Sequence, residues 1–96
     1  MSTKGQAKPP VWLSELTLSD RLLVHIAGAQ SRFESAIVER LRQWWTEKEI
    51  RAELRVLAHE HSIELDAIDR VRWRITMRGR NRARRARDRA QRKAAA

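Results

Sequence analysis

Twelve of the last twenty-seven side chains are positively charged, and this concentration limits what the chain can bury. From Arg70 to Ala96 there are eleven arginines and one lysine against a single acid, Asp88, which gives a net charge of +11 (12 − 1). Residues 1–69 hold nine basic and eleven acidic side chains, or −2, so the overall +9 belongs to a nearly neutral body joined to a cationic segment. Because unpaired charges stay out of a core, roughly sixty residues remain to build one, which is marginal for a domain that folds alone. Self-association is therefore expected, and the segregated charge indicates a polyanionic partner.

The composition also limits the class of protein. The chain has no cysteine, which excludes disulfide bonds and zinc–thiolate sites. No apolar run approaches the roughly twenty residues that a membrane span needs, and the N-terminus lacks the apolar centre of a signal peptide. We expect residues 1–10 to be a flexible leader and the protein to be soluble, either cytoplasmic or associated with the nucleoid.

Apolar residues in the body recur at helical spacing and predict an all-α fold of three or four helices. Capping-box patterns at Ser31 and Glu34, and at Thr46 and Glu49, indicate that helices begin near 31 and 46. The apolar residues between 33 and 44 step by four, four and three, and apolar positions on one side give each of the other expected helices a buried face. These faces comprise Leu22, Leu23 and Ile26; Phe33, Ile37, Leu41 and Trp44; and Ile50, Leu54, Leu57 and Ala58. We expect residues 11–77 to form this helical domain and residues 78–96 to form an arginine-rich C-terminal arm.

Other arrangements of the body stay open. Residues 29 and 30 tolerate a helix, so the stretch from 20 to 45 can instead form one long rod that packs on a second copy of the chain. The body is then either a helical monomer or an intertwined helical dimer. A helix-turn-helix is a further alternative, with Thr46–His61 as its first helix and Asp66–Met77 as its second.

The segment 70–78 fits two structures. One set of apolar residues alternates with arginines or threonine, as in a half-buried strand: Val71, Trp73, Ile75 and Met77. Another set steps by three, three and four, as in a helix: Leu65, Ile68, Val71 and Ile75. We favour the helix because no second strand-like segment is evident, so a strand would have to pair with another copy of the chain. In either case we expect Trp73 to lie in the core or at a dimer interface.

The C-terminal arm combines helix-forming residue types with strong repulsion. One stripe of arginines recurs at steps of four, three, four and three: Arg78, Arg82, Arg85, Arg89 and Arg92. Like charges four residues apart oppose the helix, so we expect the arm to become ordered only when phosphates neutralise it. Guanidinium groups bind phosphate through two hydrogen bonds and stack on bases, which makes nucleic acid the expected partner. The predicted nucleic-acid-binding residues are Arg70, Arg72, Arg74, Arg78, Arg80, Arg82, Arg84, Arg85, Arg87, Arg89, Arg92 and Lys93.

The segment from Arg78 to Lys93 resembles, in composition and helical spacing, the arginine-rich peptides by which phage antitermination proteins and some viral regulators enter RNA hairpins. The resemblance implies contacts with phosphates and groove edges from Arg82, Arg84, Arg85, Arg87 and Arg89. Those phage peptides usually lie at the N-terminus, whereas this segment is C-terminal. No family is recognised in residues 11–69.

No enzyme pattern occurs in the sequence. It lacks a glycine-rich phosphate loop, a nucleophile elbow and a His-Glu-x-x-His motif, and it has three histidines but no cysteine or tyrosine. His59 and His61 are two residues apart, which on a helix points them in different directions rather than toward one metal ion. We therefore expect no catalysis, no cofactor and no metal site.

The sequence thus predicts a small, non-enzymatic nucleic-acid-binding protein that acts as a homodimer or higher oligomer, without a membrane or a small-molecule substrate. DNA is favoured over RNA because a dimer suits duplex sites, and the size suggests transcription regulation or packaging in a phage or plasmid. One alternative is an RNA-hairpin-binding regulator. Another is a structural helical oligomer, such as a virion component, whose arm contacts genome or an acidic partner. Acidic residues of the body are also expected to pair with some arm arginines, which would mask the arm when no nucleic acid is bound.

Overall fold

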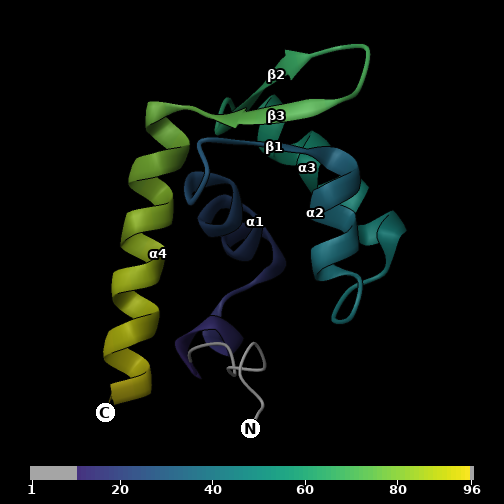
Figure 1. Ribbon diagram of the computed structural model, residues 1–96. Coiled ribbons are helices and arrows are strands. Elements are labelled where there is room, and N and C mark those ends of the chain that lie inside the picture. Colours follow the sequence, from purple (N-terminus) through teal and green to yellow (C-terminus); the bar gives the residue numbers. More distant parts are fainter. Residues whose placement is uncertain (1–10, 96) are drawn as a thin grey trace, which may run out of the picture.

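Four α-helices, a short 3₁₀-helix and one three-stranded antiparallel sheet make up residues 11–95, the part of the chain that the computed structural model describes (Figure 1). The elements in chain order are η1 (Val11–Glu15), α1 (Leu18–Ala27), β1 (Ser31–Phe33), α2 (Glu34–Leu41), α3 (Glu47–His59), β2 (Ile63–Ala67), β3 (Arg72–Ile75) and α4 (Met77–Ala95). The fold is mostly helical, but the all-α prediction is wrong in omitting the sheet. The expected leader, residues 1–10, lies outside the described residues.

The sheet resolves the ambiguity of segment 70–78 in favour of a strand. β3 is the central strand of the order β1-β3-β2, and both of its neighbours come from the same chain. Arg32 lies opposite Trp73, and Glu64 lies opposite Arg74. The prediction that residues 70–78 form a helix is therefore wrong. The expectation that a strand here would pair with a second copy of the chain is also wrong. The predicted alternation is confirmed within β3, where Trp73 and Ile75 are buried while Arg74 is exposed. It does not extend to Met77, which is exposed and begins α4.

Two of the alternative arrangements are also wrong. The long rod from 20 to 45 does not form, because α1 ends at Ala27 and Gln30 has a left-handed backbone (φ 68°) that leads into β1. The second helix proposed for a helix-turn-helix, Asp66–Met77, does not form, because this segment contains the end of β2, the turn and β3, and only Met77 is helical. The helix expected from Thr46 is present as α3. The helix joined to it by a short connection comes before it in the chain and is α2.

The two capping-box patterns have different outcomes. Thr46 caps α3 as predicted: its Oγ1 accepts from the backbone N of Glu49 at 3.1 Å, while Glu49 Oε1 accepts from the backbone N of Thr46 at 2.8 Å. The pattern at Ser31 is wrong, because Ser31 belongs to β1 and the residue that precedes α2, Phe33, makes no side-chain cap. The Glu34 side chain points into the interior, where it has stronger donors than a helix end offers.

Glu34 joins the sheet to both helices of the α2–α3 pair. Its Oε1 accepts from Trp73 Nε1 at 2.8 Å and from Arg55 Nη1 at 3.3 Å, and its Oε2 accepts from Arg51. Burial alone would raise the pKa of Glu34, but these three donors outweigh it and hold the pKa below its ordinary value. Trp73 is thus in the core, as predicted, and its indole N–H is satisfied there.

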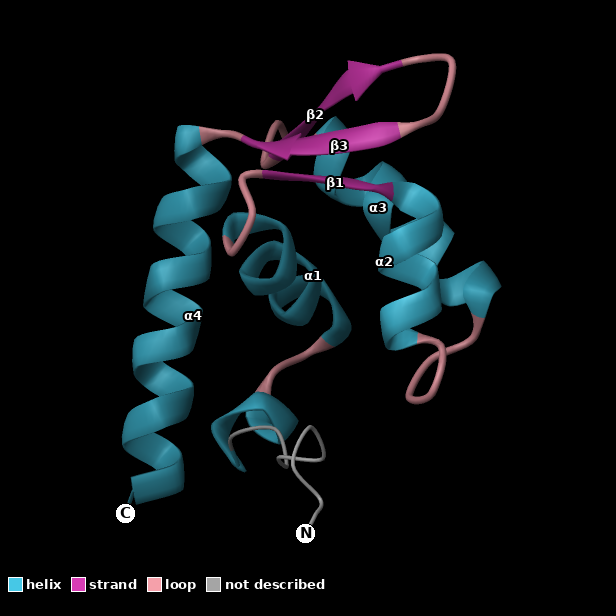
Figure 2. Cartoon of the chain, in the orientation of Figure 1, coloured by secondary structure: helices cyan, strands magenta, loops and turns pink. Residues whose placement is uncertain are grey.

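Apolar side chains of α1, α2, α3 and the sheet form one core. Its fully buried members are Leu22, Leu23, Ile26, Ile37, Leu41, Ile50, Leu54, Leu57 and Ile63. Each contributes roughly 1.5–3 kcal/mol through removal from water. The sheet lies across one end of the helices (Figure 2). None of the helices in residues 11–95 combines the length and apolarity that would let it cross a bilayer.

The arginine-rich segment is a continuous helix docked on the body rather than the arm expected to order only with phosphate. α4 runs from the sheet along α1 to η1 (Figure 1). Its inward face is made of four small buried residues at steps of four, three and four: Gly79, Ala83, Ala86 and Ala90. We call this face the small-residue seam. Burial of the seam provides the tertiary stabilisation that an isolated helix of like charges lacks.

The start of this seam gives a test of α4 docking. A Cβ on Gly79 would lie 2.0 Å from the backbone oxygen of Ser62, so Gly79→Ala must displace the first turn of α4 from the sheet. We expect a loss of about 1–3 kcal/mol in the free energy of unfolding, measured by urea denaturation. Gly28→Ala is the matched control, because its Cβ meets nothing closer than 3.5 Å and its φ is −64°. Equal stability of the two variants would contradict the docked position of α4.

Candidate nucleic-acid interface

The three predicted binding residues of the hairpin are occupied by contacts within the chain. Arg74 donates through Nη2 to Glu64 Oε2 at 2.6 Å. Arg72 Nε lies 2.8 Å from Asp66 Oδ2, an ion pair whose alignment does not make a hydrogen bond. The guanidinium carbon of Arg70 lies 4.2 Å from the centre of the Phe33 ring. Over residues 63–75 three arginines balance three acids, so the hairpin carries no net charge.

On one side of the seam, cations of α4 are paired with acids of the body. We call Arg82, Arg89 and Lys93 the paired row. Arg82 also donates through Nη2 to Ser19 Oγ at 2.8 Å. The ion pairs of the row are Arg82–Glu60 (2.9 Å), Arg82–Asp20 (3.6 Å), Arg89–Asp20 (3.6 Å) and Lys93–Glu15 (3.3 Å). The expected pairing of body acids with α4 is therefore present, and it orients the helix.

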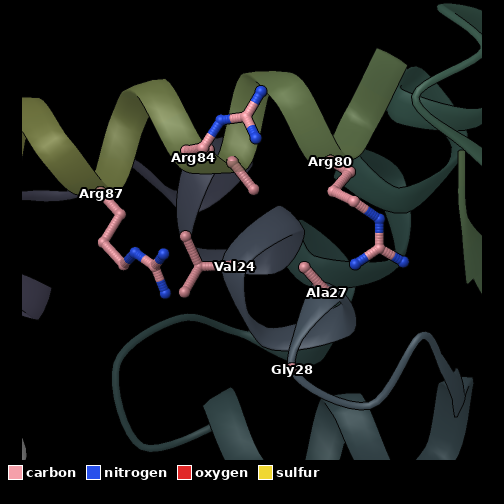
Figure 3. A pocket seen from close by; sticks show the side chains of 7 residues that line it. Val24, Ala27, Gly28, Arg80, Arg84 and Arg87 are labelled. Atoms are coloured by element: carbon pink, nitrogen blue, oxygen red, sulfur yellow. The ribbon is translucent and has the colours of Figure 1, made fainter. Parts of the chain in front are cut away.

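On the other side of the seam, arginines border a hollow instead of acids. We call Arg80, Arg84 and Arg87 the open row, because within residues 11–95 none has a carboxylate within 4 Å. A hollow of about 250 Å³ lies between this row and α1, with Val24 and Ala27 on its far side. Figure 3 shows Arg80 and Arg87 extending toward α1 from separate turns of α4, while Arg84 extends along the helix. No acidic residue lines this α1–α4 hollow.

The remaining predicted residues of α4 face solvent. Arg78, Arg85 and Arg92 are exposed, and none has a carboxylate within 4 Å in the described part of the chain. Their neighbour Asp88 is the one acid of the helix. These three arginines thus add positive charge along the outer surface of α4.

The charge of the exposed elements is very uneven. Residues 47–59 (α3) hold three basic and three acidic side chains, for a net charge of zero. Residues 77–95 (α4) hold nine basic side chains and one acidic side chain, for a net charge of +8. Electrostatic attraction for a polyanion therefore comes from α4 rather than from α3 or the hairpin.

A second cationic hollow was not evident from the sequence. Arg21, His25, Arg32 and Arg40 come from α1, β1 and α2 and line a space of about 240 Å³, the α1–α2 hollow. It shares Val24 and Gly28 with the α1–α4 hollow. Spread over twenty residues with no period, these side chains give no pattern in the sequence, and only the packing of α1 on α2 brings them together.

The positive surroundings of the α1–α2 hollow act on its histidine. Burial, followed by the charges of Arg32, Arg40 and Arg21, lowers the pKa of His25 from 6.5 to about 4. His25 is therefore neutral in the folded protein near pH 7.

Comparisons with known proteins do not assign the chain to a family. No family model matches it, and neither the curated proteins nor the solved structures gave a significant match. Within residues 11–95, no three side chains of the metal-ligating types are grouped so that they could hold an ion.

The lowered pKa of His25 predicts a pH dependence of stability. Between about pH 4 and 6.5, His25 binds fewer protons in the native state than in the unfolded state. The contribution of a neutral His25 to the free energy of unfolding is therefore fully present above pH 6.5 and is lost as the pH falls toward about 4. We expect His25→Gln to remove most of this decline, measured as the difference in free energy of unfolding between wild type and variant across the window. If the free energy of unfolding had the same pH dependence in both proteins, the assignment of this dependence to His25 would be contradicted.

Proposed function

We propose that the protein is a non-enzymatic nucleic-acid-binding factor that holds duplex DNA through phosphate contacts from α4. The observation that carries this proposal is the open row: Arg80, Arg84 and Arg87 are held on a docked helix, beside a hollow, without acidic partners among residues 11–95. Guanidinium groups in this state bind phosphate oxygens through two hydrogen bonds, and each phosphate so neutralised releases counterions from DNA. The small size suits an accessory role in regulation or packaging.

The order of elements supports a duplex as the partner. α2 and α3 are consecutive helices joined by residues 42–46, and an antiparallel hairpin, β2–β3, follows them. This arrangement resembles a winged helix-turn-helix, an architecture common among proteins that bind duplex DNA. The likeness is one of fold alone, and fold does not fix function. It favours DNA over RNA as the partner.

The docked position of α4 counts against the RNA-hairpin alternative. An arginine-rich peptide that enters a groove presents charge on several sides of its helix. In α4 the seam is buried against α1 and η1, and the paired row faces acids of the body. Only the open row and the exposed Arg78, Arg85 and Arg92 remain for a partner. This arrangement suits a contact along one surface of a duplex rather than insertion of the helix into an RNA groove. A homodimer, the structural-oligomer alternative and the cytoplasmic or nucleoid location stay predictions from the sequence.

The salt dependence of binding tests which surface contacts phosphate. We expect Arg84→Gln with Arg87→Gln to lower the slope of log affinity against log salt by about 1.8, because each phosphate contact contributes about 0.9. The measurement is fluorescence anisotropy with a short labelled duplex over a series of salt concentrations. Point substitutions are required here, since removal of α4 would expose the core beneath its seam.

A second double variant with the same loss of charge is the control. Arg42→Gln with Lys48→Gln removes two exposed cations from the α2–α3 pair. We expect this change to leave most of the slope intact. If the control lowered the slope more than the α4 variant does, the phosphate contact would lie on α2 and α3, and its assignment to α4 would be overturned.

The choice of nucleic acid requires a direct comparison. We expect the full-length protein to bind duplex DNA more tightly than an RNA hairpin or heparin at equal salt, measured by competition against the same labelled duplex. Tighter binding to the hairpin would support the RNA alternative. Equal competition by all three would show a non-specific polyanion surface and would contradict a preference for DNA.

A further inference from the structure

Arg21 is a buried cation without a counterion. The residue is 8% exposed, and its guanidinium donates from Nη1 to the backbone oxygen of Leu13 at 3.2 Å. The guanidinium also stacks over the Trp44 ring at 4.5 Å. Among residues 11–95 no carboxylate lies within 4 Å of it. Burial lowers the pKa of Arg21, and the like charge of Arg40 lowers it further. A carbonyl and an aromatic face thus only partly offset the cost of burying this charge.

Two further arginines converge on the same α1–α2 hollow. Arg32 is fixed by a hydrogen bond from its Nε to the backbone oxygen of His25 at 2.6 Å. Arg40 is exposed, and its side chain makes no ion pair within the described residues. No acidic side chain lines the hollow. Three guanidinium groups therefore border one space of about 240 Å³ and repel one another.

Within residues 11–95, several arginines of α4 also lack a carboxylate within 4 Å, but they are more exposed than Arg21, which is 8% exposed. Arg82, Arg89 and Lys93 each have a carboxylate of the body within 4 Å. The hollow has a more buried arginine and no such partner. An anion that enters the hollow would supply the missing charge to all three guanidinium groups, with two hydrogen bonds available from each planar fork.

We propose that the α1–α2 hollow binds a phosphomonoester, whose dianionic phosphate pairs with Arg21, Arg32 and Arg40. The volume exceeds that of a phosphate group alone, and Trp12, Leu13 and Leu41 supply an apolar wall for the group that the phosphate carries. Two sources share this chemistry: a free nucleotide-sized ligand and the phosphorylated 5′ end of a nucleic-acid strand. The site goes beyond the proposed function, because it does not use the open row of α4.

Inorganic phosphate, at fixed ionic strength, is the first probe. We expect phosphate to raise the Tm of the full-length protein more than chloride does, because binding to the native state alone stabilises it. Arg40→Gln should weaken the affinity for phosphate about tenfold or more, measured by isothermal titration calorimetry, since it removes a charge-assisted contact. Arg40 is suited to the test because its side chain makes no hydrogen bond or ion pair within the described residues.

Arg42→Gln is the matched control for this site. Arg42 lies two positions away on the far side of the same turn, is 63% exposed and pairs with Glu39. The Arg42→Gln variant should bind phosphate with the affinity of the wild type. Arg40→Lys should give an intermediate affinity, because lysine keeps the positive charge but lacks the planar guanidinium that donates two hydrogen bonds. Equal effects of Arg40→Gln and Arg42→Gln, or equal stabilisation by phosphate and chloride, would overturn the proposal.

Matched ligand pairs identify the source of the phosphate. A nucleoside 5′-monophosphate is compared with its nucleoside, and a 5′-phosphorylated oligonucleotide with the same strand bearing a 5′-hydroxyl. A preference for the phosphorylated member of either pair that Arg40→Gln abolishes supports the site and names its ligand. If neither pair showed a preference for the phosphorylated member, the proposed phosphate site would be overturned. Arg84→Gln with Arg87→Gln should leave these preferences unchanged, so failure of this site and failure of the DNA surface are distinguishable.

Discussion

The close approach of α4 to α1 is the constraint on which the rest of the surface depends. Gly79 lies against the backbone of Ser62, and the three seam alanines pack against the core and η1. Burial of this seam fixes which face of α4 meets the body. This orientation places Arg82 and Arg89 near Asp20 and Glu60. On the other side of the helix, the open row has no carboxylate within 4 Å among residues 11–95. Pairing on one side offsets part of the repulsion within the helix. The open row is left without acidic partners among the described residues, and Arg84 donates instead to Asn81 Oδ1 at 2.9 Å.

The interior contains two buried charges with opposite surroundings. Glu34 receives hydrogen bonds from Trp73, Arg51 and Arg55, so the chain itself completes the stabilisation of that carboxylate. A buried charge satisfied in this way fixes how the sheet meets α2 and α3, and it needs no ligand. Arg21 is satisfied only by a carbonyl and a ring, beside other cations. This difference separates a structural charge from one that is poised to accept an anion.

The sequence could predict what depends on local pattern. The start of α3 at Thr46 and the burial of Trp73 follow from a capping motif and from alternation, and both are confirmed. β1 could not be predicted, because three residues, Ser31–Phe33, carry no period and form a strand only against β3. The pattern at Ser31 and Glu34 was misleading for the same reason, since tertiary donors compete for that carboxylate. The α1–α2 hollow depends wholly on packing, whereas the concentration of arginine in α4 is visible in the composition.

In the proposed function, the separation of the charge of α4 from α2, α3 and the hairpin has a consequence for recognition. Contacts to phosphate position a protein on DNA, whereas contacts to base edges specify sequence. α3 and the hairpin carry no net charge, and the hairpin arginines are held by Glu64, Asp66 and Phe33. Affinity that comes mainly from α4 is sequence-independent and falls steeply with salt. In the proposed complex, any preference for sequence would come from a few exposed side chains of α3, after α4 has bound the phosphates.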